Sequence, residues 1–255
     1  MDPEKCALII TSSVYVSARH TALIDPAERQ RQYLDSISWF IQESPLTKII
    51  VCDNSGFTWP LSLYGQAAAQ GKKIELLSFT GNNSLVEQLG KGYGEGEIMA
   101  YIMTNSVLLR EVDGFLKVTG RLKLVNSRKL LARCKPGNNY FNPVSLLRPR
   151  FLVPKAARPC VDVKVYYVTT DFFRDVLLSA YKDVRDDQIF FLEHAYYQAI
   201  ARSISSGSPT RVTCFPIAPE ITGMSGSNGW TLTERSLPKK LLIRLVARLG
   251  YIRPV

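Results

Sequence analysis

The stretch from Gly90 to Asn126 decides the fold and reads GKGYGEGEIMAYIMTNSVLLREVDGFLKVTGRLKLVN. Its four alternating glycines, from Gly90 to Gly96, predict a loop whose backbone can approach a ligand closely and expose its amides. Apolar residues then recur at helical spacing over residues 98–109, and residues 115–125 alternate like a strand. The stretch therefore predicts a glycine-rich loop, a helix and a strand, in that order.

The predicted strand carries a row of polar side chains. Lys117, Thr119 and Arg121 share one face, while leucines and a valine occupy the other. Adjacent members of such a row lie about 6.5–7 Å apart. Two cations and a hydroxyl at that spacing suit an anion such as a diphosphate, which arginine can bind through two parallel hydrogen bonds. The alternative is an edge strand whose basic face is solvated.

Three apolar runs upstream predict buried strands over residues 7–10, 48–52 and 73–79. Helical patterns separate them, and the first begins at Asp25, with Pro26 at its first position and Glu28 completing a capping box. This alternation predicts an α/β fold with a mostly parallel sheet flanked by helices. Small polar residues end each run, at 11–13, 53–56 and 80–83, and would meet at the carboxyl edge where such sheets bind ligands.

The composition favours an anionic partner. The 255 residues carry a formal net charge of +10, which suits a phosphorylated donor, a membrane surface or nucleic acid. The five cysteines are scattered without a Cys-x-x-Cys pair, which argues against a structural zinc site. The sequence shows no signal peptide and no apolar run near the roughly 20 residues needed to cross a bilayer, so we expect a cytoplasmic protein.

Residues 236–253 predict a basic amphipathic helix. Lys240, Arg244 and Arg248 lie four residues apart, and leucines form the adjoining apolar face. Such a helix can lie on an anionic membrane, so we expect the protein to be peripheral at the inner face of the membrane. The alternative is a terminal helix docked on the core.

The order of these features resembles glycosyltransferases of the GT-A type. The Ile-Val-Cys-Asp53-Asn-Ser run, the loop over 92–97 and the strand over 117–121 are similar to small bacterial transferases of capsule and O-antigen synthesis. The resemblance covers roughly residues 7–200. It implies a single GT-A-like domain with a Rossmann-like sheet: a donor-binding half over 1–126, an acceptor half over 127–230 and the C-terminal helical segment 231–255.

The resemblance places the nucleotide at the strand ends, where Thr11, Ser12, Asp53 and Ser55 would hold the base and ribose. With the loop and the polar row, the expected donor-binding residues are Thr11, Ser12, Ser13, Asp53, Asn54, Ser55, Gly92, Tyr93, Gly94, Glu95, Lys117, Thr119 and Arg121. The chain departs from the family's Asp-x-Asp motif, since it has Lys117-Val-Thr119-Gly-Arg121 there. Cations in place of carboxylates would neutralise the diphosphate directly, so we expect no cofactor and no metal ligands, with a divalent metal as the less favoured alternative.

An inverting transferase also needs a base for the acceptor hydroxyl. The candidates are Asp186, Asp187, Glu193 and His194, of which the last three are preferred, on a helix predicted from the Arg185-Asp186-Asp187 run to Ile200. Asp186 precedes Glu193 by two helical turns, so one face would present both. In the alternative interpretation the aspartates stabilise the helix N-terminus and His194 is a surface group. A retaining transferase would need no such base.

These features together predict an enzyme that moves a sugar from a nucleotide-activated donor to a glycan acceptor, expected to be lipid-linked, in surface polysaccharide synthesis. One alternative is a non-catalytic protein that binds a nucleotide or nucleic acid; another is an idle assembly subunit, which would explain the missing Asp-x-Asp. Nucleic acid is disfavoured because aromatic residues are not interleaved with the basic clusters, as stacking platforms would require.

Overall fold

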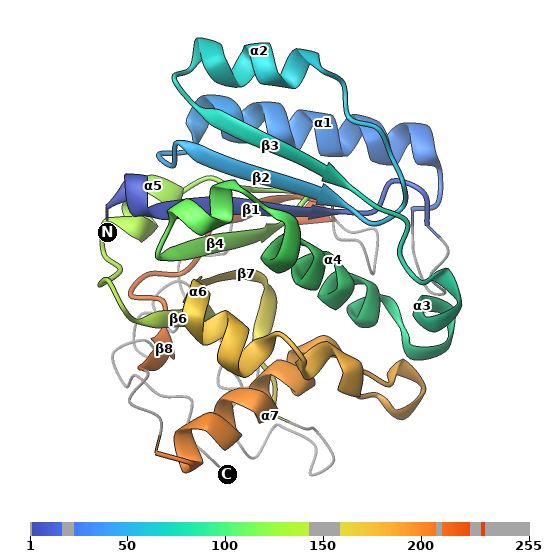
Figure 1. Cartoon of the computed structure of the whole chain (residues 1–255), viewed down its shortest axis with the longest axis vertical. Coiled ribbons are helices and arrows are strands. Elements are labelled where there is room, and N and C mark those ends of the chain that lie inside the picture. Colours follow the sequence, from blue (N-terminus) through green and yellow to red (C-terminus); the bar gives the residue numbers. More distant parts are fainter. Residues whose placement is uncertain (1, 17–22, 143–158, 208–210, 225–230, 233–255) are drawn as a thin grey trace.

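A computed structural model describes residues 2–16, 23–142, 159–207, 211–224 and 231–232. Its centre is a seven-stranded sheet in the order β3-β2-β1-β4-β7-β6-β8 (Figure 1). The strands are β1 (Cys6–Ser12), β2 (Lys48–Asp53), β3 (Lys73–Ser78), β4 (Gly114–Thr119), β6 (Asn139–Asn142), β7 (Asp162–Thr169) and β8 (Val212–Cys214). Within this sheet β7 runs antiparallel to its neighbours, and the remaining pairs are parallel. The predicted mostly parallel sheet is confirmed.

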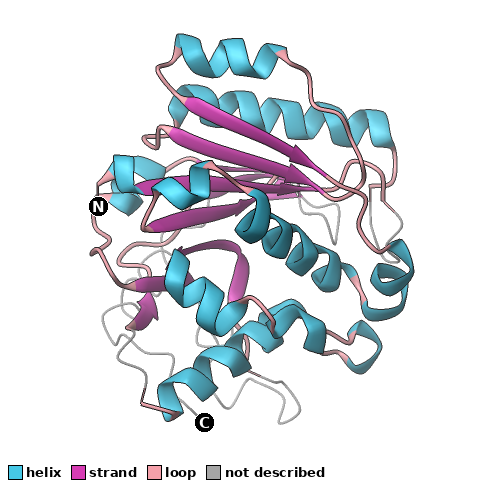
Figure 2. Ribbon diagram, viewed as in Figure 1, coloured by secondary structure: helices cyan, strands magenta, loops and turns pink. Residues whose placement is uncertain are grey.

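Helices cover both faces of the sheet and give three layers (Figures 1 and 2). The helices are α1 (Pro26–Glu43), α2 (Ser62–Ala69), α3 (Asn83–Leu89), α4 (Lys91–Asn105), α5 (Ser127–Leu131), α6 (Thr170–Phe172) and α7 (Leu192–Ser205). Short 3-10 turns cover Pro3–Lys5, Leu108–Glu111, Ala180–Asp183 and Asp186–Gln188, and a π-helical turn covers Phe173–Leu177. Because β1, near the start of the chain, and β8, more than 200 residues later, share one sheet, the fold is a single α/β domain.

The alternation of side chains along β1 divides the core between the two layers of helices. Cys6, Leu8 and Ile10 pack in the core with α1 and α2, whereas Ala7 and Ile9 pack in the core with α4 and α7. All of these side chains are fully buried, as expected for a central parallel strand covered on both faces. The carboxyl end of β1 thus lies between the two layers of helices.

The start of α1 follows from its sequence. The Asp25 carboxylate accepts a hydrogen bond from the Ala27 amide at 3.0 Å, and Pro26 occupies the first helical position. The predicted capping box is not formed, because the Glu28 carboxylate binds Arg31 and Gln32 instead. The buried stripe of α1 begins with Arg29, an unusual residue for such a position.

The glycine-rich stretch is helical, which corrects the predicted loop. Gly92, Gly94 and Gly96 lie buried in the first two turns of α4. A Cβ at Gly96 would lie 2.0 Å from the Cβ of Tyr181, and one at Gly92 would lie 2.9 Å from the Cβ of Leu192. These glycines therefore let the segment over 181–192 pack closely on α4. The space beside the glycines, which the sequence analysis reserved for a ligand, is thus occupied by another part of the chain.

The predicted strand over 115–125 is broken at Gly120. A Cβ there would lie 2.3 Å from the Thr11 carbonyl oxygen, to which the Gly120 amide donates at 2.9 Å. The chain then continues as β5 (Leu122–Leu124), which belongs to a second sheet with β9 (Ile221–Met224) and β10 (Thr231–Leu232). Lys117 and Thr119 therefore lie on β4, whereas Arg121 lies in the turn after it.

The predicted membrane-facing helix over 236–253 lies outside the described residues. Among the helices that are described, none has the length and apolar character needed to span a bilayer.

Candidate functional site

A cavity of about 520 Å³ opens at the carboxyl ends of β1 and β4. Its walls come from α1 on one side of the sheet and from α4, β7 and the start of α7 on the other. The volume lies within the range of about 300–1,000 Å³ that is typical of small-molecule sites. The cavity thus occupies the edge of the sheet where the sequence predicts a ligand.

The cavity brings together most, but not all, of the predicted site residues. Those that line it are Thr11, Ser12, Ser13, Asn54, Gly92, Gly94, Glu95, Thr119, Arg121 and Glu193. Those that do not are Asp53, Ser55, Tyr93, Lys117, Asp187 and His194. Arg29, Tyr33, Lys164 and Asp186 also line it, although the sequence analysis assigned none of them a donor-binding role.

Asp53 organises the loops beside the cavity. Its fully buried carboxylate accepts from the Val14 amide at 3.0 Å, the Ser55 amide at 2.7 Å and the Phe57 amide at 3.3 Å. The Ser55 hydroxyl accepts from the amides of Val14 and Tyr15 at 3.1 and 3.0 Å. Asp53 and Ser55 therefore fix the loops after β1 and β2, and their predicted direct contact with the base and ribose stays a prediction.

Arg29 fixes the same loop from the other side. Its Nε donates to the carbonyl oxygens of Ser13 and Val14 at 2.9 and 3.1 Å, and its Nη1 donates to Leu23 O at 3.0 Å. Burial lowers the pKa of this guanidinium. The sequence contained a signal for this role of Arg29. Arg29 lies four residues before Tyr33 on the apolar stripe of a predicted helix, and an arginine buried there needs dedicated hydrogen-bond partners.

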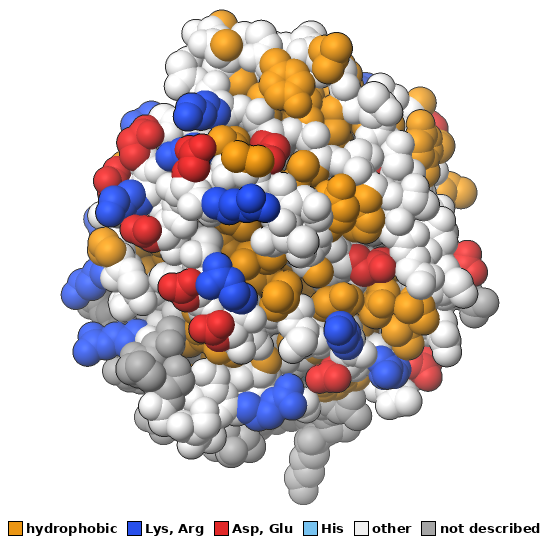
Figure 3. Space-filling model, in the orientation of Figure 1, with side chains coloured by type: hydrophobic (Ala, Val, Ile, Leu, Met, Phe, Trp, Pro, Cys, Tyr) orange, Lys and Arg blue, Asp and Glu red, His pale blue; other side chains and the backbone are white. Residues whose placement is uncertain are grey.

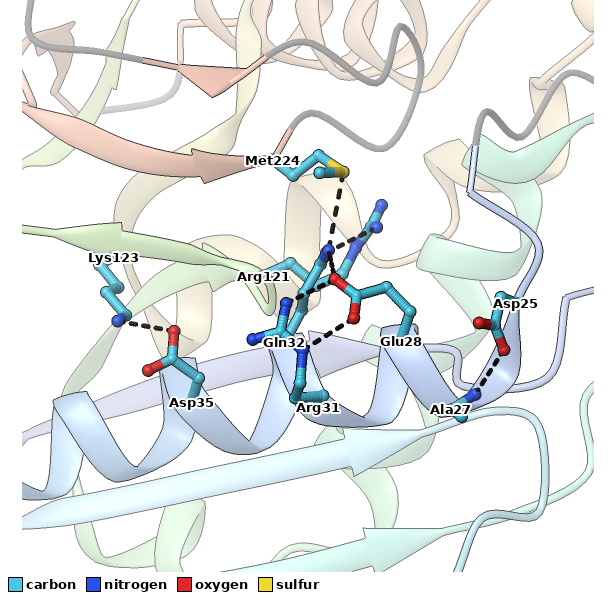
Figure 4. A network of polar contacts seen from close by, with 9 residues as sticks. All are labelled: Asp25, Ala27, Glu28, Arg31, Gln32, Asp35, Arg121, Lys123 and Met224. Carbon is cyan, nitrogen blue, oxygen red and sulfur yellow. Dashed lines mark hydrogen bonds and ion pairs between the residues drawn. The ribbon is translucent and has the colours of Figure 1, made fainter.

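Arg121 is the second buried arginine of the cavity. Its side chain is 7% exposed, and its Nη1 donates to Gln32 Oε1 at 3.2 Å (Figure 4). The guanidinium carbons of Arg29 and Arg121 lie 5.7 and 5.8 Å from the centre of the Tyr33 ring, within the range of cation–π interactions. Neither arginine forms an ion pair with a carboxylate in the described part of the chain. We call Arg29, Tyr33 and Arg121 the cationic wall.

Lys117 lies beneath the cavity rather than in it. Its side chain is 0% exposed, and its ammonium binds Glu95 Oε1, Thr119 Oγ1 at 3.0 Å and Val163 O at 2.8 Å. These three acceptors match the three N–H donors of a lysine ammonium. Lys117 therefore neutralises Glu95 and holds the Thr119 hydroxyl at the cavity surface. This position does not favour the predicted contact between Lys117 and a diphosphate, which stays a prediction.

Tyr93 is also directed away from the ligand space. Its ring packs against that of Tyr181 with centroids 5.1 Å apart, so it joins α4 to the segment over 181–192.

Carboxylates line the part of the cavity that α4, the 3-10 turn over Asp186–Gln188 and the start of α7 form. Glu95 on α4, Asp186 in its 3-10 turn and Glu193 in the first turn of α7 all line it, and we call them the acidic wall. Burial raises the pKa of Glu193, the nearby Glu95 charge adds to this, and Lys164 opposes it. Lys164 itself pairs with Asp162 at 3.4 Å. A carboxyl group with a raised pKa in a cavity is suited to accept a proton from a substrate.

The helix predicted from Arg185 onwards begins later, at Leu192. Ile189 adopts a left-handed conformation with φ 54°, which separates the 3-10 turn of Asp186 from α7. Asp186 and Glu193 therefore do not share a helix face; tertiary packing brings both to the cavity.

Asp187 and His194 do not reach the cavity. Asp187 is exposed on the 3-10 turn, and His194 Nδ1 accepts from the Phe191 amide at 3.0 Å at the start of α7. The predicted catalytic roles of Asp187 and His194 are therefore not supported, and Glu193 is the preferred candidate base that lines the cavity.

Within the described ranges, no three His, Cys, Asp or Glu side chains come together in a way that could hold a metal ion. The Glu95 carboxylate is already bound to Lys117. Metal-independent chemistry itself stays a prediction.

No protein-family model and no curated protein sequence matches the chain. The fold is similar to that of 4-diphosphocytidyl-2C-methyl-D-erythritol synthase from Anaerococcus prevotii, with 8% identity, a TM-score of 0.45 and coverage of 95% of this chain and 96% of the other. It is also similar to that of a candidate nucleotide-diphospho-sugar transferase from Desulfovibrio desulfuricans, with 10% identity, a TM-score of 0.44 and coverage of 82% of this chain and 78% of the other. For core-mannan synthase A from Aspergillus fumigatus, in its Mn/GDP form, the identity is 9%, the TM-score is 0.40 and the coverage is 94% of this chain and 82% of the other. These likenesses are too remote to carry an inference about activity.

Proposed function

We propose that the protein is a glycosyltransferase that takes a sugar from a nucleotide-activated donor and binds the donor diphosphate at Arg121. The observation that carries this proposal is a buried arginine without a carboxylate partner in the described part of the chain, on the wall of a cavity at the carboxyl edge of a mostly parallel sheet. Ligands of open α/β sheets bind at that edge.

The energetics of burial support an anionic ligand. A charge removed from water is costly unless it is paired, and within the described residues Arg121 forms a single hydrogen bond, to a neutral amide. Arg29 lies near it, and the Arg121 charge contributes to the lowered pKa of Arg29. A diphosphate would offset both the burial and the repulsion, and arginine binds phosphate oxygens in a bidentate manner.

The other parts of the cavity fit the remaining parts of such a donor. Thr11, Ser12 and Ser13 at the end of β1 offer polar groups for the base and ribose, beside the apolar side chains of Val16 and Val86. Glu193 would accept the proton of the acceptor hydroxyl, since its raised pKa makes it a better base than an exposed glutamate. Arg121 would stabilise the departing diphosphate in place of a metal ion.

The acceptor in this proposal is a glycan, lipid-linked, in surface polysaccharide synthesis. The support comes from the sequence: the basic amphipathic pattern of 236–253 suits an anionic membrane surface, where a lipid-linked acceptor would reside. Co-sedimentation with anionic vesicles, compared between the full chain and Lys240→Glu/Arg244→Glu, tests this part separately. Equal co-sedimentation of both proteins would contradict it.

Calorimetry tests the donor site directly. Binding of UDP, GDP, ADP and CMP would be measured in EDTA and again with manganese, for the wild type and for Arg121→Met. We expect one nucleotide to bind without metal and Arg121→Met to weaken its binding about 10- to 150-fold, the range for a hydrogen-bonded charged partner. Arg133→Met, which removes an exposed arginine outside the cavity, is the matched control.

Three results would contradict the proposal in different places. Binding only with manganese would mean that the diphosphate is held by a metal ion on carboxylates of the protein, and not by Arg121. Equal affinity in Arg121→Met would remove Arg121 from the site. No nucleotide binding at all would reject the donor class.

A nucleic-acid ligand gains no support from the face of the molecule seen in Figure 3. On the face seen in Figure 3, lysines and arginines are interspersed with aspartates and glutamates, whereas nucleic-acid binding uses a continuous basic stripe.

A further inference from the structure

The side chain of Gln32 links Arg121 to a carboxylate without allowing the two to meet. Gln32 lies on α1; its Oε1 accepts from Arg121 Nη1 at 3.2 Å, and its Nε2 donates to Glu28 Oε1 at 2.7 Å (Figure 4). The same Nε2 lies 3.6 Å from Met224 Sδ on β9. The amide of Gln32 therefore separates the buried Arg121 from Glu28, which lies on α1 like Gln32 itself.

The orientation of this amide is fixed by its neighbours. An ionised carboxylate only accepts hydrogen bonds and a guanidinium only donates them. The NH₂ group of Gln32 must therefore face Glu28, and its carbonyl oxygen must face Arg121; a flipped amide would place two acceptors and two donors against each other. Gln32 can satisfy both partners in one orientation only.

Glu28 is satisfied without Arg121. Its two carboxylate oxygens accept from Arg31 Nη2 and Nε at 2.6 and 2.7 Å, as Figure 4 shows. These bonds, followed by the one from Gln32, lower the pKa of Glu28 to about 2. Glu28, one helical turn before Gln32, is thus neutralised by the exposed Arg31.

We propose that Gln32 sets the affinity of the cavity for a doubly charged phosphate group by keeping the charge of Arg121 uncompensated. A glutamate of the same shape at position 32 would pair with Arg121 and occupy the charge that the ligand needs. An amide orients the guanidinium and leaves its charge available, and Arg121 has no other hydrogen bond to the described residues. This inference rests on the proposed donor site and names the residue that tunes it.

The test moves one carboxylate along α1 without changing the net charge. In Glu28→Gln/Gln32→Glu the hydrogen-bonded chain can re-form in reverse, with the carboxylate shifted one turn toward Arg121. Binding of inorganic pyrophosphate would be measured by calorimetry in EDTA for the wild type, this double variant, Gln32→Glu and Gln32→Met. Gln66→Glu, which places the same charge change at an exposed site on α2, is the control.

We expect both variants that carry Gln32→Glu to lose about 10- to 150-fold in pyrophosphate affinity, as for loss of a charged hydrogen-bond partner. Gln32→Met should lose less than about 5-fold, because Arg121 keeps its charge, and Gln66→Glu should match the wild type. Thermal unfolding of each variant verifies that it is folded, and the double variant keeps the test valid where Gln32→Glu alone repels Glu28.

Two results would overturn the proposal. Wild-type affinity in the folded double variant would show that a carboxylate at position 32 does not quench the site. Equal losses in Gln32→Met and the double variant would show that Gln32 acts through geometry alone. If the wild type bound no pyrophosphate, the donor site itself would fail, and this failure is distinct from the first two.

Discussion

The cations beside the acidic wall and those of the cationic wall differ in whether they pair with a carboxylate. On the acidic side each described buried or half-buried lysine has a carboxylate partner: Lys117 pairs with Glu95, and Lys164 with Asp162. On the cationic side Arg29 binds backbone carbonyls and Arg121 binds an amide. Neither forms an ion pair with a carboxylate in the described part of the chain, although the charge of Asp53 acts on Arg29 from farther away.

This difference distinguishes buried cations that stabilise the fold through an ion pair from buried cations that could still pair with an anionic ligand. A paired buried cation already has its counter-charge, and removing the partner is what costs free energy. An unpaired buried cation at a cavity surface gains free energy when an anion binds. The comparison therefore supports the proposed anion binding at Arg121 and a structural role for Lys117, although both belong to one polar row in the sequence.

The largest expected effect is on turnover, at the acidic wall. Glu193→Gln should lower kcat about 10²–10⁴-fold, because it removes the general base, while donor affinity stays within about twofold. The wild-type kcat should fall as the pH drops through the pKa of Glu193, at a higher pH than for an ordinary glutamate, because burial raises that pKa. Steady-state kinetics against pH measure both effects.

Asp187→Asn and His194→Ala are the matched controls, since these side chains do not line the cavity. Either should retain most of the activity. A loss equal to that of Glu193→Gln in one of them would transfer the role of base to that residue.

The next effect is on stability, at the floor of the cavity. Lys117→Met leaves Glu95 without its buried partner and should lower the free energy of unfolding by about 3–5 kcal/mol. Lys117→Met/Glu95→Gln should recover part of that loss, because no unpaired charge remains. Urea denaturation followed by circular dichroism gives both values.

Lys123→Met is the control for this experiment. Lys123 pairs with Asp35 at 2.7 Å, as Figure 4 shows, but Asp35 is mostly exposed. The expected loss is about 0–1 kcal/mol. Equal destabilisation by Lys117→Met and Lys123→Met would remove the distinction between a structural and a surface cation.

The smallest effect is the stability cost of a base with a raised pKa. Because folding raises the pKa of Glu193, its stabilising contribution is fully present below the unfolded-state pKa and is lost as the pH rises through the folded-state pKa. Glu193→Gln should therefore raise the Tm at pH 8 by up to about 2–4 °C relative to the wild type, and by less at pH 4. Scanning calorimetry at the two pH values decides it, and an equal shift at both would contradict this origin.

Much of the architecture could be predicted from the sequence because its causes are local. Three apolar runs with small polar residues after them define β1, β2 and β3, and Asp25 with Pro26 defines the start of α1. Parallel strands connected by helices place their carboxyl ends at one edge. For that reason Thr11, Ser12, Ser13 and Asn54 were correctly expected near the cavity.

The roles of the glycines and of the two acidic candidates could not be read in the same way. Alternating glycines fit a ligand-binding loop as well as a helix, and the side chain of Tyr181, far along the chain, decides for the helix. Likewise, sequence spacing puts Asp186 and Glu193 on one helix, whereas the left-handed Ile189 separates them. Local patterns do not contain the distant partner that settles such cases.

The sequence by itself determined a mostly parallel α/β sheet with a polar carboxyl edge and a row of cations near it. Only the tertiary structure decided which cation is available to a ligand. β4 ends at Thr119, and the next residue must be glycine because the Thr11 carbonyl leaves no room for a Cβ. Arg121, in the turn that follows, lies against α1 and lines the cavity. Lys117 remains on β4, where Glu95 from α4 meets it. The charge of a side chain is a property of the residue, but its availability depends on partners that other parts of the chain supply.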